Sequence, residues 1–192
     1  MAKFNAYRIT DYSEFDNFEC GLEEMDSFIH SSYGLRMSID NHYCKCFGVK
    51  DEHGTTVAIF ALAFDSVTLD SDSTDDLFSG IMSAIPNISL EYTENFKAKN
   101  HHPALEIVYL AVHKDHRGKN IGESVIESIV NMARNQNIAG CEFITVDAYH
   151  NKEYSAVGFY SKCQFYTLDL TPRKDTTRMF RMLYPKETFE ED

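Results

Sequence analysis

A short run of glycines and cations has the residue types needed to hold a phosphate group. The run consists of Arg117, Gly118, Lys119, Asn120, Ile121 and Gly122. Small or flexible residues let backbone N–H groups turn toward an anion at the start of a helix. Arg117 and Lys119 add positive charge, so a pyrophosphate would fit. A solvent-exposed loop that only starts a helix has the same composition, and the residue types alone leave both interpretations open.

The segments around this run predict a strand, a helix and a second strand. Residues 105–112 are apolar and β-rich, residues 121–136 carry apolar side chains at helical spacing, and residues 142–149 are again β-rich. Two strands joined through a helix in this way run parallel in one sheet. The run of residues 117–122 therefore connects a strand to the N-terminus of a helix.

The rest of the chain predicts an α/β (α+β) fold in a single domain, residues 1–192. Residues 65–103 form an irregular insertion with at most one short helix, either a lid or a mobile loop. Residues 186–192 form an acidic tail. Further strands are predicted at residues 4–9, 43–49, 56–64, 164–168 and 176–184, and further helices at residues 22–29 and 154–162.

The composition restricts the partners and the compartment. The formal net charge of -12 opposes binding to a polyanion such as RNA, and it favours a basic or neutral partner or simply solubility. The five cysteines are scattered, and Cys44 and Cys46 fall on one strand face without further metal ligands, which favours buried thiols. No apolar run reaches membrane-spanning or signal-peptide length, so we expect a soluble, cytoplasmic protein.

Two motifs give the chain a resemblance to the GNAT acetyltransferase superfamily. Residues 117–122 resemble the acyl-CoA loop Arg/Gln-x-x-Gly-x-Gly/Ala, with Asn120 in place of the first glycine. Residues 156–165 are similar to the segment Ala-x-x-Phe-Tyr-x-Lys-x-Gly-Phe, with Gln164 where glycine is usual. The resemblance implies a mixed sheet of six to seven strands that splays between strands four and five, with about four helices around it.

The resemblance also implies that acetyl-CoA binds as co-substrate and that no metal takes part. The expected coenzyme-binding residues are Leu110, Ala111, Val112, Arg117, Gly118, Lys119, Asn120, Ile121, Gly122, Glu123 and Asn151. Tyr160 would protonate the departing thiolate, although an aromatic residue on a helix can also be a core residue. Glu106, or a water chain, would remove the proton of the amine, although a solvated carboxylate at a strand start looks the same in sequence.

These residues predict an N-acetyltransferase that moves an acetyl group to a primary amine of a small molecule or protein. Two alternatives stay open. Residues 18–29 look like the opening helix of toxins that acetylate aminoacyl-tRNA, although the net charge argues against a nucleic-acid partner. A non-catalytic module would bind acyl-CoA without turning it over. A monomer and a homodimer are both compatible with the sequence.

Overall fold

The computed structural model describes residues 6–68, 90–167 and 175–183. These residues fall into two compact units, each of which is described by itself. The first unit holds residues 6–64 and 106–137, and the second holds the described residues of 65–105 and 138–183. The acidic tail and residues 69–89 of the predicted insertion lie outside the described residues.

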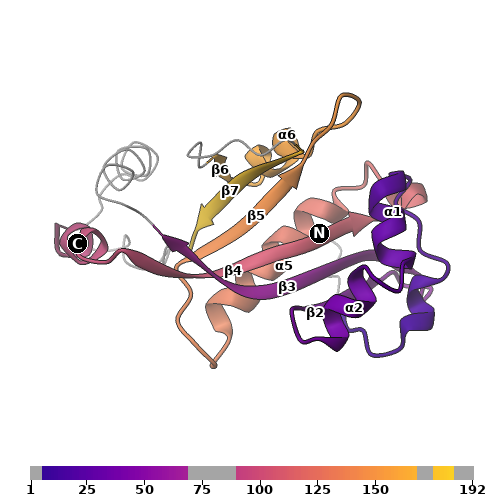
Figure 1. The fold of residues 1–192 in the computed structure, drawn as a ribbon, viewed down its shortest axis with the longest axis horizontal. Helices are drawn as coiled ribbons and strands as arrows, with labels where there is room; N and C mark the ends of the chain where they lie inside the picture. Colours follow the sequence, from indigo (N-terminus) through magenta and orange to yellow (C-terminus); the bar gives the residue numbers. More distant parts are fainter. Residues whose placement is uncertain (1–5, 69–89, 168–174, 184–192) are drawn as a thin grey trace. The chain divides into compact units, whose positions relative to one another are not determined.

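Seven strands form a mixed sheet, as the sequence predicts. Hydrogen bonds link them in the order β1-β2-β3-β4-β5-β7-β6. Neighbouring strands are antiparallel in the pairs β1 with β2, β2 with β3, β5 with β7 and β6 with β7, and Figure 1 shows the opposite directions of β5 and β7. The strands are β1 (Ala6–Arg8), β2 (Lys45–Lys50), β3 (Thr56–Thr68), β4 (His101–Val112), β5 (Phe143–Tyr149), β6 (Tyr166–Thr167) and β7 (Thr176–Met182).

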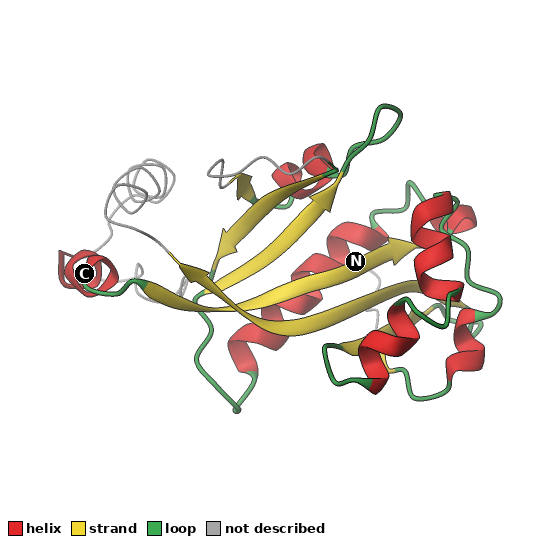
Figure 2. Ribbon diagram, viewed as in Figure 1, coloured by secondary structure: helices red, strands yellow, loops and turns green. Residues whose placement is uncertain are grey.

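Five α-helices accompany the strands in the described part of the chain (Figure 2). None of the helices described here is long and apolar enough to cross a membrane. Two 3-10 turns, η1 (Tyr12–Phe15) and η2 (Lys114–His116), lie between them in sequence. The helices are α1 (Glu23–His30), α2 (Leu35–Asp40), α4 (Leu90–Lys97), α5 (Ile121–Asn135) and α6 (Val157–Lys162).

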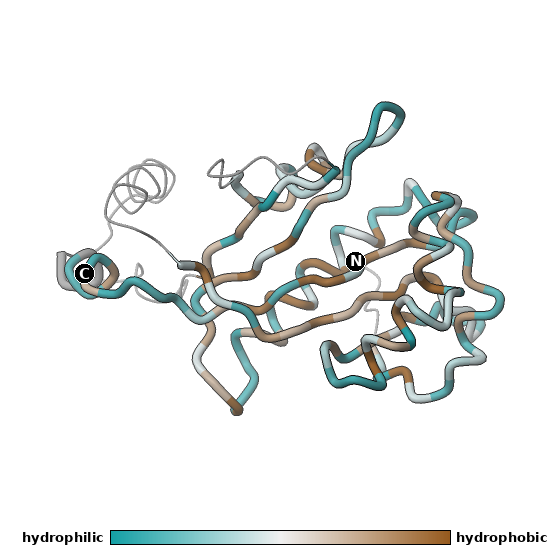
Figure 3. The backbone as a smooth tube through the Cα atoms, in the orientation of Figure 1, coloured by the Kyte–Doolittle hydropathy of each residue, from teal (hydrophilic) through white to brown (hydrophobic). Residues whose placement is uncertain are grey.

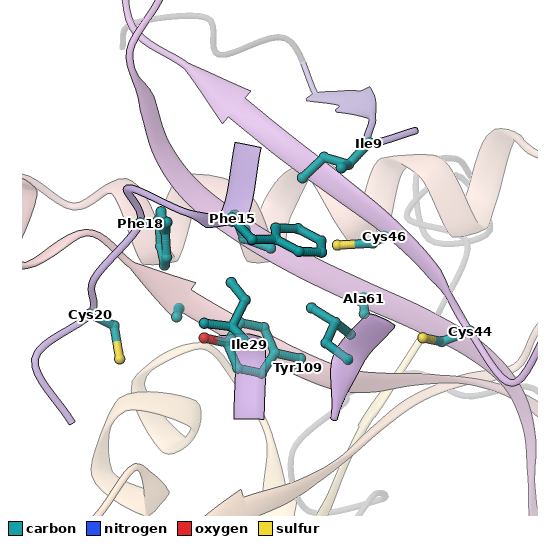
Figure 4. Packing of buried hydrophobic residues seen from close by; sticks show 12 residues of the cluster. Ile9, Phe15, Phe18, Cys20, Ile29, Cys44, Cys46, Ala61 and Tyr109 are labelled. Carbon is teal, nitrogen blue, oxygen red and sulfur yellow. The ribbon is translucent and has the colours of Figure 1, made fainter. Parts of the chain in front are cut away.

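The core of the first unit lies between the sheet and the two N-terminal helices. Ile29 of α1 and Leu35 of α2 pack against Ala61 of β3 and Tyr109 of β4, all of them buried. Figure 4 shows side chains of these elements pointing into one interior, and Figure 3 shows the hydrophobic middle of β3 and β4. Cys44 and Cys46 belong to the same cluster, and burial raises the pKa of both thiols. These cysteines are structural, as predicted.

Helix α5 has an amphipathic sequence that accounts for its length. Its apolar residues recur at intervals of three and four, so one face is continuously apolar. The residues of that face are buried: Ile121, Val125, Ile126, Ile129, Val130 and Ala133. The helix begins at Ile121 as predicted, which fixes the C-terminal side of the candidate phosphate-binding run.

Both ends of the predicted insertion are regular strand, which corrects the irregular structure expected over residues 65–103. Strand β3 continues to Thr68, and β4 begins at His101. Asp65 is kept in the strand by an ion pair with Arg178 and by a hydrogen bond of 2.5 Å from the hydroxyl of Thr145. Among the described residues of this stretch, one short helix is present as α4.

A buried histidine organises the core of the second unit. The ring of His102 is fully buried, stacks on Phe96 at 4.2 Å between centroids and meets the ring of Phe143 edge-on. Its Nδ1 lies 2.9 Å from a carboxylate oxygen of Glu142. Sequence patterns miss this histidine because a polar residue at the start of a strand resembles a loop.

The hydroxyl of Tyr109 gives a direct test of the packing in the core of the first unit. It is buried and has no hydrogen-bond partner among the described residues, and burial raises the pKa of the phenol. An unpaired buried polar group costs about 1–3 kcal/mol. We therefore expect Tyr109→Phe to leave the free energy of unfolding unchanged or to raise it, as measured by urea denaturation.

Tyr7→Phe is the matched control for this substitution. The hydroxyl of Tyr7 donates to Glu14 and lies 3.1 Å from the hydroxyl of Thr56. Its loss should lower the free energy of unfolding by about 1–2 kcal/mol. A comparable loss in Tyr109→Phe would show that the Tyr109 hydroxyl has a partner in the folded protein.

Candidate functional site

The run that follows β4 has an unusual backbone conformation. Gly118 has φ +74° and Asn120 has φ 57° with ψ 20°, so two residues in three adopt left-handed angles. Gly118 has open space where a β-carbon would lie, which leaves room for a ligand. Asparagine is among the non-glycine residues that best tolerate this conformation, so Asn120 can replace glycine here. The left-handed angle at position 120 thus gives a backbone reason for asparagine in place of the first glycine of the motif.

The turn leads directly into the N-terminus of α5 and leaves its first amides without partners inside the helix. The first helical bond runs from the amide of Ser124 to the carbonyl of Asn120, at 3.1 Å. The side chain of Asn120 makes no capping hydrogen bond. The amides of Ile121, Gly122 and Glu123 therefore lack acceptors within the helix, and the helix dipole adds partial positive charge at this end.

Charged side chains surround the turn. Lys114, Arg117 and Lys119 lie within six positions of one another and are exposed, with Asp115 as the acidic residue among them. The ammonium group of Lys119 donates to the carbonyl of Asp115 at 3.4 Å, which leaves its charge beside the turn. The local excess of positive charge contrasts with the net charge of -12 for the whole chain. This arrangement can bind a phosphate or pyrophosphate.

Strand β4 presents one buried face and one partly open face to its surroundings. Ile107, Tyr109 and Ala111 are at most 5% exposed. Val108 is 38% exposed, and three other residues of its face, Glu106, Leu110 and Val112, are half-buried. Side chains alternate along a strand, so Glu106 shares this partly open face with Val108. Since the side chain of Ala111 belongs to the core, a contact between Ala111 and a coenzyme would use its backbone.

Tyr160 lies in α6 of the second unit and is held there by aromatic contacts. It is 5% exposed, and its ring meets those of Phe159 and Phe165 edge-on at 5.1 and 5.3 Å. Burial raises the pKa of the phenol, so it stays protonated throughout the neutral range. It can therefore act as an acid at neutral pH but not as a base.

The C-terminus of α6 closes with a pattern that explains the usual glycine at position 164. The amide of Phe165 donates to the carbonyl of Tyr160 at 3.0 Å, and that of Gln164 donates to the carbonyl of Ser161 at 3.1 Å. Gln164 has φ 65°, the left-handed angle that this cap requires. In addition, the buried side chain of Arg181 donates to the carbonyl of Cys163 at 3.1 Å. Sequence reasoning missed Arg181, because only the register of β7 brings it to this helix end.

The side chain of Asn151, one of the expected coenzyme-binding residues, makes hydrogen bonds to the backbone. Its side-chain oxygen accepts hydrogen bonds from the amides of Glu153 and Tyr154 at 2.8 and 2.7 Å. These bonds form a tight turn between β5 and α6. Because of this turn, α6 begins only at Val157. The helix predicted over residues 154–162 therefore began three residues too early.

The structure therefore places the predicted residues in two groups. Residues 117–122, Glu106 and the predicted β4 residues belong to the first unit, whereas Asn151 and Tyr160 belong to the second. No cluster of three or more potential metal ligands occurs among the described residues.

A comparison with protein-family models shows which known domain this part of the chain resembles. Residues 88–167 match the model of the acetyltransferase (GNAT) domain. This match confirms the GNAT resemblance for the matched residues, which make up less than half of the chain. The match indicates an acyltransferase, and the matched segment contains Glu106, residues 117–122 and Tyr160. Among curated proteins, no relative matches the sequence.

Solved structures support the GNAT fold over nearly the full length of the chain. A bacterial toxin aligns with a TM-score of 0.66 at 16% identity, covering 95% of this chain and 92% of its own. AtaTR bound with acetyl-CoA aligns at 0.64 and 16% identity, covering 95% of each chain. AtaT complexed with acetyl-methionyl-tRNA aligns at 0.63 and 16% identity, covering 98% of each chain. The fold thus occurs in a protein complexed with tRNA, and it gives no support to the expectation against a nucleic-acid partner.

The left-handed angle in the cap of α6 leads to a stability prediction. A residue other than glycine with left-handed angles costs roughly 1 kcal/mol. We expect Gln164→Gly to raise the free energy of unfolding by about that amount, as measured by chemical denaturation.

Gln136→Gly is the control, because Gln136 follows α5 with φ -72° and has no left-handed strain to relieve. It should not stabilise the protein. Equal stabilisation by both substitutions would contradict a role for the backbone angle at position 164.

Proposed function

We propose that this enzyme binds acetyl-CoA through residues 117–122 and transfers the acetyl group to an amine within a ternary complex. The observation that carries the proposal is the first turn of α5, whose amides lack helical partners and follow two left-handed residues. Arg117 and Lys119 supply positive charge for the diphosphate of the coenzyme. An AtaTR structure with acetyl-CoA at 16% identity supports this choice of donor.

The proposed reaction forms one bond and breaks one. The neutral amine attacks the carbonyl carbon of the thioester, and the C–N bond forms as a tetrahedral intermediate. The C–S bond then breaks, and the thiolate takes a proton from the hydroxyl of Tyr160. Glu106, or a water molecule, accepts the proton that the ammonium group loses. Backbone amides of β4 near Leu110 and Val112 would polarise the carbonyl oxygen.

The proposed mechanism assigns the protonation of sulfur to Tyr160. The alternative, a non-catalytic acyl-CoA-binding module, assigns no chemical step to this residue. The two proposals differ in what they expect of Tyr160, so substitution of this residue separates them.

Tyr160→Phe tests catalysis. Loss of a general acid lowers kcat by about 10²–10⁴-fold, while the Kd for CoA should stay within about twofold because the ring remains. Thiol release with a panel of amines measures the first quantity, and calorimetry measures the second. The neighbouring Tyr154→Phe is the control and should keep its kcat. If the wild type is active and Tyr160→Phe has the same kcat, Tyr160 is not the group that protonates sulfur.

The pH profile gives an independent check on Tyr160. Because burial raises its pKa, the acid form persists above the ordinary tyrosine value of about 10. A loss of kcat caused by ionisation of Tyr160 should therefore appear only above about pH 10. If a pH limb at lower pH disappears in Tyr160→Phe, the assignment of a raised pKa to this residue is wrong.

Gly118→Ala tests the phosphate-binding turn. The substitution strains a left-handed position by about 1–2 kcal/mol and disturbs the turn, so the Kd for CoA should rise on the order of tenfold. Gly54→Ala is the control, because Gly54 also has a left-handed φ, +82°, and open space around it, but lies between β2 and β3. Both variants should lose stability, but only Gly118→Ala should lose affinity. Equal affinities would contradict the proposed turn.

Aminoacyl-tRNA is a second candidate acceptor. The alignment with AtaT complexed with acetyl-methionyl-tRNA favours it, and the net charge of -12 opposes it. Acetylation of aminoacyl-tRNA that weakens steeply with salt, with no turnover of small amines, would support the RNA acceptor. Turnover of small amines or peptides alone would support the first reading.

A further inference from the structure

Residues 18–21, which precede α1, lie against the beginning of the phosphate-binding turn. The backbone amide of Lys114 donates to the carbonyl of Glu19 at 2.9 Å, and their side chains form an ion pair. The ring of Phe18 meets that of His113 edge-on at 5.7 Å between centroids. The segment thus contacts two consecutive residues just ahead of the turn, one through a ring and one through both backbone and side chain.

The carboxylate of Asp26 fixes this segment to α1. One of its oxygens accepts from the amide of Cys20 at 2.7 Å, and the other accepts from the amide of Gly21 at 2.9 Å. Burial alone would raise the pKa of Asp26, but the hydrogen bonds from these amides outweigh it and lower the pKa. The carboxylate is therefore ionised at neutral pH, and both of its oxygens are used.

The segment has little freedom to move by itself. Phe18 and Cys20 are each 1% exposed, and the imidazole Nε2 of His30 lies 3.0 Å from the carbonyl of Phe18. A β-carbon on Gly21 would lie 3.5 Å from Cβ of Lys114, so residues 18–21 lie close to the segment that precedes the turn. Burial raises the pKa of the Cys20 thiol to about 11, which leaves it uncharged beside the turn.

We propose that Asp26 is a positioning residue for the coenzyme, which acts through residues 18–21 on the turn at 117–122. This inference rests on the proposed function. Asp26 lies more than 90 positions from the turn in sequence and takes no part in the acetyl transfer. When residues 18–21 lose their anchor, Lys114 and His113 lose the contacts that define the start of the turn. The amides of α5 then bind the diphosphate less well.

Loss of the Asp26 charge and loss of its positioning contacts should change the affinity for CoA in opposite directions, which makes the inference testable. Removal of a negative charge near a phosphate site strengthens binding if charge alone matters. Removal of the double amide contact weakens binding if position matters. Asp26→Asn does both at once, because asparagine keeps one acceptor oxygen and loses the second.

The experiment measures the Kd for CoA by calorimetry, and the KM for acetyl-CoA and kcat by thiol release. For Asp26→Asn we expect Kd and KM to rise on the order of tenfold, while kcat at saturating donor and the KM for the amine stay unchanged. Glu24→Gln removes the same charge from an exposed position on α1 and should leave all four values unchanged. Glu19→Gln, which weakens only the ion pair with Lys114, should show a smaller rise.

Each outcome has a separate meaning. Wild-type protein that binds no CoA would overturn the proposed function itself. A wild type that binds CoA, together with Asp26→Asn of equal or higher affinity, would overturn only the role of Asp26. If Asp26→Asn does not fold, Glu19→Gln decides, since an unchanged Kd for that variant contradicts a link between the segment and the turn. Melting temperatures of the free proteins show which variants are folded during the measurement.

Discussion

The backbone between β4 and α5 has to turn within a few residues, and this constraint governs the candidate site. The turn requires left-handed angles at Gly118 and Asn120, which most side chains resist. It also exposes the first amides of α5, which lack partners within the helix. Unpaired amides cost free energy unless water or a ligand binds them. The strained turn and the proposed anion binding therefore have the same cause.

The packing on both sides holds this turn in place. The apolar face of α5 is buried from Ile121 onward, so the helix cannot rotate to hide its N-terminus. Ahead of the turn, Lys114 is bound to Glu19 through backbone and side chain. Positive charge is thus concentrated at one fixed place in a chain that is acidic overall. The diphosphate of the coenzyme is the ligand that we propose for this charge.

Local patterns predicted the elements that carry strong periodicity. The spacing of apolar residues predicted helix α5, and the prediction of a helix over residues 154–162 placed Tyr160 on a helix. Patterns failed where long-range contacts decide the structure: Asp65 extends β3 because it pairs with Arg178, which is 113 positions away, and the six-residue helix α2 is too short for a periodic signal. The anchoring contacts of Asp26 and Arg181 are to backbone atoms, which no pattern of side-chain types encodes.

The most direct test of the turn follows the backbone amides by NMR while CoA is added. The account predicts that the amide resonances of Ile121, Gly122 and Glu123 shift downfield in a saturable manner, as expected when these groups donate to phosphate oxygens. A 3′,5′-ADP titration should produce smaller shifts at the same positions, because this fragment lacks the diphosphate. If CoA binds and shifts resonances elsewhere while these three amides stay unchanged, the central claim about the turn is wrong.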